Sequence, residues 1–244
     1  MDHAASSSGQ HSAGESPAAR KRRFKYSPVG FLVALVLLIV TIPAVEDIEH
    51  GDLIEAILLT LVLVSAVLAL GARRRTFFQA ALLVTPALAG KWINHLWPER
   101  LPPVVFLSAA MLFLIFVVAH LLHFILHAPR VDAGVICAAI STYLVLGFLW
   151  AIAYGMVAKV TPEAFAYNTG PKDSHIMMGG TAFYFSFITL CTLGYGDIVP
   201  VSKVARMLAV TEAITGVFYV AILMARLVTL YSSPRHSGHD ESTK

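Results

Sequence analysis

The residues with the clearest chemical pattern lie between residues 189 and 200, where the sequence reads T-L-C-T-L-G-Y-G-D-I-V-P. Gly194 and Gly196 alternate here with larger residues, and glycine adopts left-handed backbone angles at low cost. Such angles let successive carbonyl oxygens of an extended chain point the same way. A row of carbonyl oxygens can replace the water around a cation, and the Thr192 hydroxyl adds one more oxygen. The stretch is therefore a candidate cation site, although G-Y-G-D alone is also typical of a loop turn.

The composition of the chain restricts the setting of this stretch. Of the 244 residues, 57% are hydrophobic and 14% are charged, with a net charge of +3. This chain is too apolar for a soluble domain of its size, so we expect a membrane protein with several spans. The two cysteines, Cys137 and Cys191, lie in apolar surroundings and are expected to be buried small side chains rather than a disulfide.

Six apolar segments account for most of the chain. A helix needs about 20 apolar residues to cross about 30 Å of hydrocarbon, and each segment approaches or exceeds this length. The sequence therefore predicts six membrane-spanning helices. They are Val29–Val45, Leu53–Leu70, Thr76–Leu96, Pro103–Leu126, Ala133–Val160 and Lys203–Tyr231.

Thr192-Leu193-Gly194-Tyr195-Gly196-Asp197 resembles the selectivity filter of tetrameric potassium channels, and an aromatic-rich stretch precedes it. The resemblance implies an all-α membrane protein with a re-entrant pore half-helix, Thr181–Thr189, and a filter loop between the fifth and sixth spans. One filter supplies a quarter of each carbonyl ring, so four subunits would surround one pore. Potassium would be the permeant ion, without a cofactor or catalytic residue. The resemblance assigns potassium coordination to Thr192, Leu193, Gly194 and Tyr195, and the shape of the outer mouth to Gly196 and Asp197.

Four regions follow from this layout. Residues 1–28 form a basic tail without apolar periodicity, which we expect to be disordered. Residues 29–128 form a four-helix, sensor-like membrane domain, and residues 129–231 form the pore domain. Residues 232–244 form a short polar tail, and we expect no cytosolic regulatory domain.

The distribution of basic residues predicts the orientation. With the N-terminal tail, the 73–75 loop, Arg130 and the C-terminal end on one side, that side holds 12 of the 18 Lys and Arg residues. This predicts a multi-pass protein of the cell membrane with both termini in the cytoplasm. The N-terminal basic cluster is expected to contact anionic lipid rather than nucleic acid, and consists of Arg20, Lys21, Arg22, Arg23 and Lys25.

The last apolar segment contains two residues that stand out from their surroundings. Gly216 lies in mid-helix and is interpreted either as a gating hinge, by resemblance, or as a site of close helix packing. Glu212 is ionisable near membrane depth, and we expect it to support the back of the filter through hydrogen bonds. Two residues differ from the commonest filter pattern, because Leu193 replaces a valine and Cys191 a threonine.

The fourth apolar segment has the position of a voltage sensor but contains no lysine or arginine. Arginine-based voltage sensing is therefore excluded for this helix. It does contain His120, His123 and His127, which share one helical face. They are interpreted as a polar stripe, a proton sensor or a metal site.

The sequence thus favours a homotetrameric potassium channel that conducts passively and is not gated by an arginine-rich sensor. The first alternative is an auxiliary channel subunit that does not conduct alone, motivated by Leu193 and Cys191. The second is a metal-dependent membrane enzyme built on the three histidines. No carboxylate or nucleophile accompanies those histidines, which counts against an enzyme.

Overall fold

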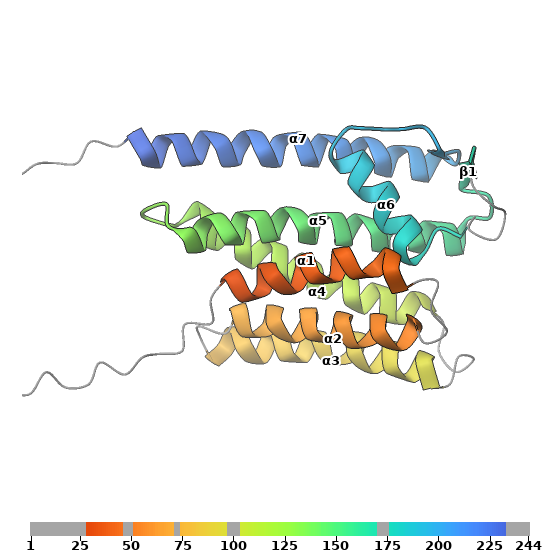
Figure 1. Ribbon diagram of the computed structural model, residues 1–244, viewed down its shortest axis with the longest axis horizontal. Coiled ribbons are helices and arrows are strands. Elements are labelled where there is room, and N and C mark those ends of the chain that lie inside the picture. Colours follow the sequence, from red (N-terminus) through yellow and green to blue (C-terminus); the bar gives the residue numbers. More distant parts are fainter. Residues whose placement is uncertain (1–27, 46–50, 71–73, 97–102, 170–175, 233–244) are drawn as a thin grey trace, which may run out of the picture.

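The computed structural model describes residues 28–45, 51–70, 74–96, 103–169 and 176–232 (Figure 1). These residues form helices and one short strand pair. The elements are α1 (Pro28–Val45), α2 (Gly51–Leu70), α3 (Arg74–Leu96), α4 (Pro103–Leu126), α5 (Ala133–Val160), β1 (Phe165–Tyr167), α6 (Gly179–Leu190), β2 (Ile198–Pro200) and α7 (Lys203–Ser232). The basic cluster at 20–25 and most of both polar tails lie outside the described residues.

The helices begin and end close to the limits of the apolar segments. The six long helices start within two residues of the predicted starts, and only α7 ends elsewhere, one residue later. Local signals account for some of these ends, because the Asp132 carboxylate caps α5 by accepting from the Val135 amide at 2.8 Å. Pro86 lies inside α3 and does not end it.

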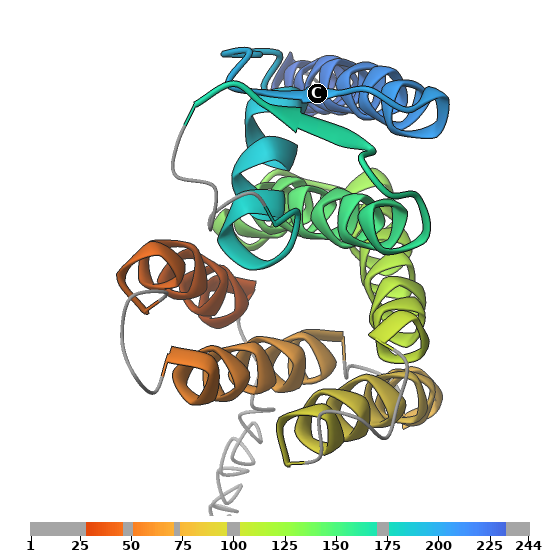
Figure 2. The same cartoon turned by 90° about the vertical axis from the view of Figure 1, so that its right-hand side faces the viewer.

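Helices α1 to α5 form a ring in which each packs on the next and α5 closes onto α1 (Figure 2). Every helix of the ring contributes fully or almost fully buried side chains to one core, among them Leu35, Leu63, Ala80, Phe113 and Val135. This core crosses the predicted boundary at residues 128 and 129. The sensor-like helices and the fifth helix therefore share one continuous core.

A second core lies where α6 passes between α5 and α7 (Figure 1). Three aromatic rings pack edge to face there, with Tyr154 and Phe165 at 4.8 and 5.5 Å from the ring of Phe185. These residues come from α5, β1 and α6, so the core fixes α6 against the outer strand pair.

Three helices of the described chain are long and apolar enough to cross a membrane, over Val104–Leu126, Ala133–Val160 and Lys203–Thr229. Shorter apolar stretches occupy Pro28–Ile42, Ala56–Ala69 and Thr76–Gly90. Apart from the short strand pair, the described chain therefore has the helical build of an all-α membrane protein. Helix α6 has 12 residues, and at about 1.5 Å per residue it is too short to span a bilayer.

Two features of the region between α5 and α7 differ from the sequence-based expectation. The half-helix runs from Gly179 to Leu190, so it begins two residues before and ends one residue after the predicted Thr181–Thr189. The predicted loops on either side of it also contain strands. β1 and β2 pair antiparallel, with Phe165 opposite Pro200 and Tyr167 opposite Ile198.

Candidate functional site

Close contacts with two long helices position α6. A Cβ atom added to Gly147 of α5 would lie 2.2 Å from the Phe187 ring, and one added to Gly216 of α7 would lie 2.3 Å from the carbonyl oxygen of Leu190. Small residues allow helices to approach closely, and here glycine is the only residue that fits without movement. The C-terminal half of α6 is therefore fixed against both α5 and α7.

The loop after α6 is hydrogen-bonded to the last turn of the helix. The amides of Leu193 and Gly194 both donate to the Ile188 carbonyl oxygen, at 2.8 and 3.2 Å, and the Thr192 amide donates to that of Thr189 at 2.9 Å. The last carbonyls of a helix have no partner within the helix, so the loop satisfies them. The start of the candidate cation site is thereby fixed relative to α6.

Left-handed backbone angles recur at every second residue of this loop. The φ angles of Thr192, Gly194 and Gly196 are 57°, 52° and 78°, and Leu193 and Tyr195 have negative φ. This alternation is the backbone condition under which successive carbonyl oxygens can face one side. The glycines were expected to supply it. Thr192 adopts it too, at a typical cost of roughly 1–3 kcal/mol for a side chain other than glycine.

Two side chains outside the loop hold its outer end. The Tyr184 hydroxyl donates to Asp197 Oδ2 at 2.7 Å, and this bond raises the pKa of Tyr184 to about 12. Asn168, directly after β1, donates from Nδ2 to the Gly196 carbonyl oxygen at 2.7 Å. Its backbone amide donates to the Asp197 carbonyl oxygen, also at 2.7 Å.

Behind α6, the carboxylate of Glu212 joins three helices. Ser186 of α6 and Tyr154 of α5 both donate to it, the serine at 2.6 Å. The Ser186 hydroxyl also lies 2.8 Å from the Gly147 carbonyl oxygen. Glu212, Ser186 and Tyr154 are fully buried, and such a carboxylate requires these donors because it has left water.

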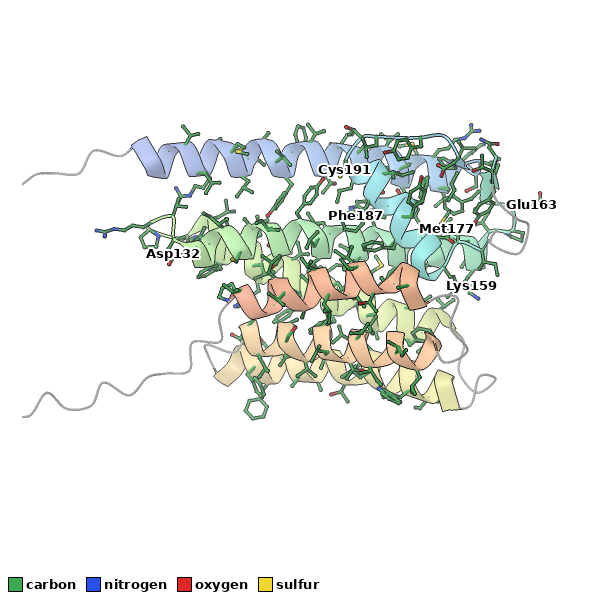
Figure 3. The ribbon with its side chains drawn as sticks, viewed as in Figure 1. Asp132, Lys159, Glu163, Met177, Phe187 and Cys191 are labelled. Atoms are coloured by element: carbon green, nitrogen blue, oxygen red, sulfur yellow. The ribbon has the colours of Figure 1, made fainter. Side chains whose placement is uncertain are left out.

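The side chains of the loop are open in the single chain. Leu193 is 58% exposed and Tyr195 is 68% exposed. Cys191 and Cys137 are free thiols. The expectation that both are buried is wrong for Cys191, which is exposed at the end of α6 (Figure 3), with Sγ 3.3 Å from the Tyr143 hydroxyl. Cys137 is half-buried.

Sequence reasoning missed Asn168, Tyr184, Ser186 and Tyr154. All four act through contacts with residues 13 to 58 positions away, which residue type and spacing do not reveal. The only local signal was the polar Asn168 next to the apolar run that forms β1.

The comparisons with known proteins concern the same part of the chain. A family model described as ion channel matches residues 138–233. Two-pore potassium channel 4 of Arabidopsis thaliana is 32% identical over 88 residues, which are 36% of this chain and 30% of that protein. The voltage-gated potassium channel Kch of Escherichia coli is 49% identical over 47 residues, 19% of this chain and 11% of that protein. Residues 138–233 are therefore similar to ion channels, and the relatives that match there are potassium channels.

The similarity covers only part of the length of each relative. The inward rectifier potassium channel Kirbac3.1 of Paramagnetospirillum magnetotacticum is 27% identical over 96 residues, 38% of this chain and 28% of that protein. The matched stretch thus spans a third or less of the length of these relatives. No solved structure matches the chain. The matched family model and relatives are channels, which supports a channel rather than an enzyme.

The three histidines do not form one cluster, and His127 lies one residue beyond the end of α4. His123 and His127 lie with ring centroids 4.0 Å apart, and His127 Nδ1 is 2.9 Å from the His123 carbonyl oxygen. His120 instead stacks on Phe116, with ring centroids 5.9 Å apart. Within the described ranges, no three His, Cys, Asp or Glu side chains are placed to hold a metal ion. The pair lies at the end of the molecule where α4 turns into α5, far from the potassium-channel-like loop (Figure 1).

One contact in the channel-family region joins this far end to α7. Arg226 donates through Nη2 to the carbonyl oxygens of Leu126 and Ala128, at 2.9 and 3.2 Å. These carbonyls lie at the end of α4, where the chain turns into α5. Arg226 therefore connects the last helix to the corner between α4 and α5.

Proposed function

We propose that the chain is a subunit of a potassium-selective channel that conducts passively through a homotetrameric pore. The observation that carries the proposal is the alternation of positive and negative φ angles from Thr192 to Gly196, directly after a half-helix. Rings of carbonyl oxygens from Thr192, Leu193, Gly194 and Tyr195 would replace the water around potassium. Gly196 and Asp197 would shape the outer mouth.

Four copies are needed because one chain supplies one strand of the filter. The surface of α7 agrees with this requirement. Many of its large apolar side chains are exposed in the single chain and would be covered by neighbouring copies, by the pore or by lipid. They include Met207, Val210, Ile214, Val217, Phe218 and Ile222.

In the proposed layout all six long helices span the cell membrane, α6 enters from outside, and both termini are cytoplasmic. The excess of Lys and Arg on one side supports this orientation. The C-terminal carbonyls of α6 would direct partial negative charge towards a cation below the filter. Since α4 contains no Lys or Arg, the channel would not be gated by arginine charges moving in the field. The basic cluster at 20–25 would contact anionic lipid.

Two residues of α7 have proposed supporting roles. Glu212 would hold the back of the filter helix through Ser186 and Tyr154. Gly216 contacts Leu190 so closely that packing alone accounts for a glycine, while bending of α7 at Gly216 stays a prediction.

The test is ion flux from liposomes that contain the purified full chain. The proposal predicts potassium flux that exceeds sodium flux and is blocked by barium. Equal flux of the two ions would contradict selectivity. Absence of flux would instead favour the auxiliary-subunit alternative.

A further inference from the structure

The strand pair at the outer end of the molecule brings one polar side chain to the filter loop. β1 and β2 are in register, with Tyr167 opposite Ile198, so the next residue along β1 lies beside Asp197. That residue is Asn168. Its backbone amide continues the ladder by donating to the Asp197 carbonyl oxygen, which places its side chain within reach of Gly196.

The Gly196 carbonyl oxygen is the atom that Asn168 controls. Nδ2 of Asn168 donates to it at 2.7 Å, a short and therefore well-formed amide hydrogen bond. A carbonyl oxygen that accepts this bond is directed to the strand pair. Residues 192 to 195 are the proposed coordinating set, and Gly196 is the first residue whose carbonyl oxygen has such a side-chain donor.

The peptide after Gly196 would otherwise rotate easily. Gly196 has a φ of 78°, a Cβ atom added there would meet nothing within 4 Å, and glycine adopts several backbone conformations at similar free energy. The Tyr184 hydroxyl holds the Asp197 side chain but not the Gly196 carbonyl. Sterics therefore do not fix the orientation of this peptide, and a hydrogen bond is needed.

We propose that Asn168 is a positioning residue that orients the Gly196 carbonyl and so sets the outer end of the filter. The inference rests on the proposed function, since it gives Asn168 a role in the same conduction path. Loss of the bond frees this peptide to rotate, and the outermost ion position becomes disordered. A potassium ion at that position holds the neighbouring carbonyls, so external potassium and the Asn168 amide stabilise the same conformation.

The sharpest variant is Asn168→Asp, because it keeps the shape and removes the donor: a carboxylate only accepts hydrogen bonds. Asn168→Ala removes the donor without adding charge. Asn168→Gln keeps an amide and is expected to restore part of the effect. Thr169→Ala, at the exposed neighbouring residue, is the matched control.

The readout is sustained potassium flux from liposomes at low and at high external potassium. We expect Asn168→Asp and Asn168→Ala to reduce sustained flux about 2- to 10-fold at low external potassium, the factor that corresponds to one hydrogen bond. High external potassium should restore it. A general folding defect would lower flux equally under both conditions.

Two outcomes would overturn the inference. The first is a dependence on external potassium that is the same in Asn168→Ala as in the wild type, with potassium flux intact. The second is equal hydrogen exchange of the amides at 193–199 in Asn168→Ala and Thr169→Ala, whereas faster exchange in Asn168→Ala supports the inference. This measurement tests the contact even if the wild type does not conduct, a result that would count against the proposed function.

Discussion

Gly216 of α7 lies against the carbonyl oxygen of Leu190, so close that a Cβ atom there would approach this oxygen to 2.3 Å. The last residue of the half-helix thus rests directly on the backbone of the long helix that follows it. No side chain lies between the two, and the end of α6 takes its position from α7.

The first prediction concerns this contact. Gly216→Ala should destabilise the protein by about 1–3 kcal/mol, because the new methyl group meets backbone rather than a movable side chain. Thermal unfolding of the purified protein measures this. Gly155→Ala is the control, since its Cβ atom would lie 3.5 Å from the nearest atom, an ordinary contact. Stabilisation by Gly216→Ala would show that packing does not require this glycine, and would leave flexibility as its role.

Glu212 provides the second prediction. Glu212→Ala should lower the free energy of unfolding by roughly 2–4 kcal/mol, because it leaves a buried cavity and removes the acceptor of the Tyr154 hydroxyl. Ser186 would lose less, since the Gly147 carbonyl oxygen remains within its reach. In a double-mutant cycle Tyr154→Phe should destabilise the wild type but have little effect in Glu212→Ala. Additive effects would contradict the coupling.

Arg226 gives the third prediction. Arg226→Met keeps the aliphatic stem but loses both bonds to the end of α4, and should speed hydrogen exchange of the amides at 127–132. The control Arg130→Met removes an exposed charge at the same corner. If Arg226 couples this corner to α7, potassium flux should change in Arg226→Met and not in Arg130→Met. Unchanged exchange and flux would show that the contact has no role.

The fourth prediction tests proton sensing by α4. If the His123 and His127 pair senses protons, flux should depend on pH, because two positively charged rings whose centroids lie 4.0 Å apart would repel each other. Substituting Asn for both His123 and His127 should reduce the dependence of potassium flux on pH. His120→Asn should reduce it less, because the His120 ring stacks on Phe116 instead. An identical pH profile in the double variant would leave the polar-stripe interpretation.

Much of the fold follows from local pattern. Apolar runs of membrane length end where polar residues begin, which is why the predicted ends of the long helices agree with the structure to within two residues. The half-helix was harder to delimit, because Gly179 and Gly180 resemble a loop and nevertheless form its first turn. The three-residue strands β1 and β2 are too short for a periodicity of their own and exist through pairing.

Only the glycine-containing loop of the candidate site could be predicted from the sequence. The alternating glycines marked the backbone requirement, but the left-handed angle of Thr192 had no signal in the residue type. Glu212 was expected to support the filter, whereas its partners Tyr154 and Ser186 depend on how α5 and α6 pack. The hydrogen bond from Asn168 to the Gly196 carbonyl oxygen depends on the register of β1 and β2, which no local pattern in the sequence shows.

The most direct measurement is the permeability of potassium relative to sodium through the purified full chain in liposomes. We expect flux that is selective for potassium and blocked by barium. We also expect Gly194→Ala to abolish selective flux, because alanine does not readily adopt the left-handed angle found there. Sodium flux equal to potassium flux in the wild type, or selective flux retained by Gly194→Ala, would contradict the proposed function.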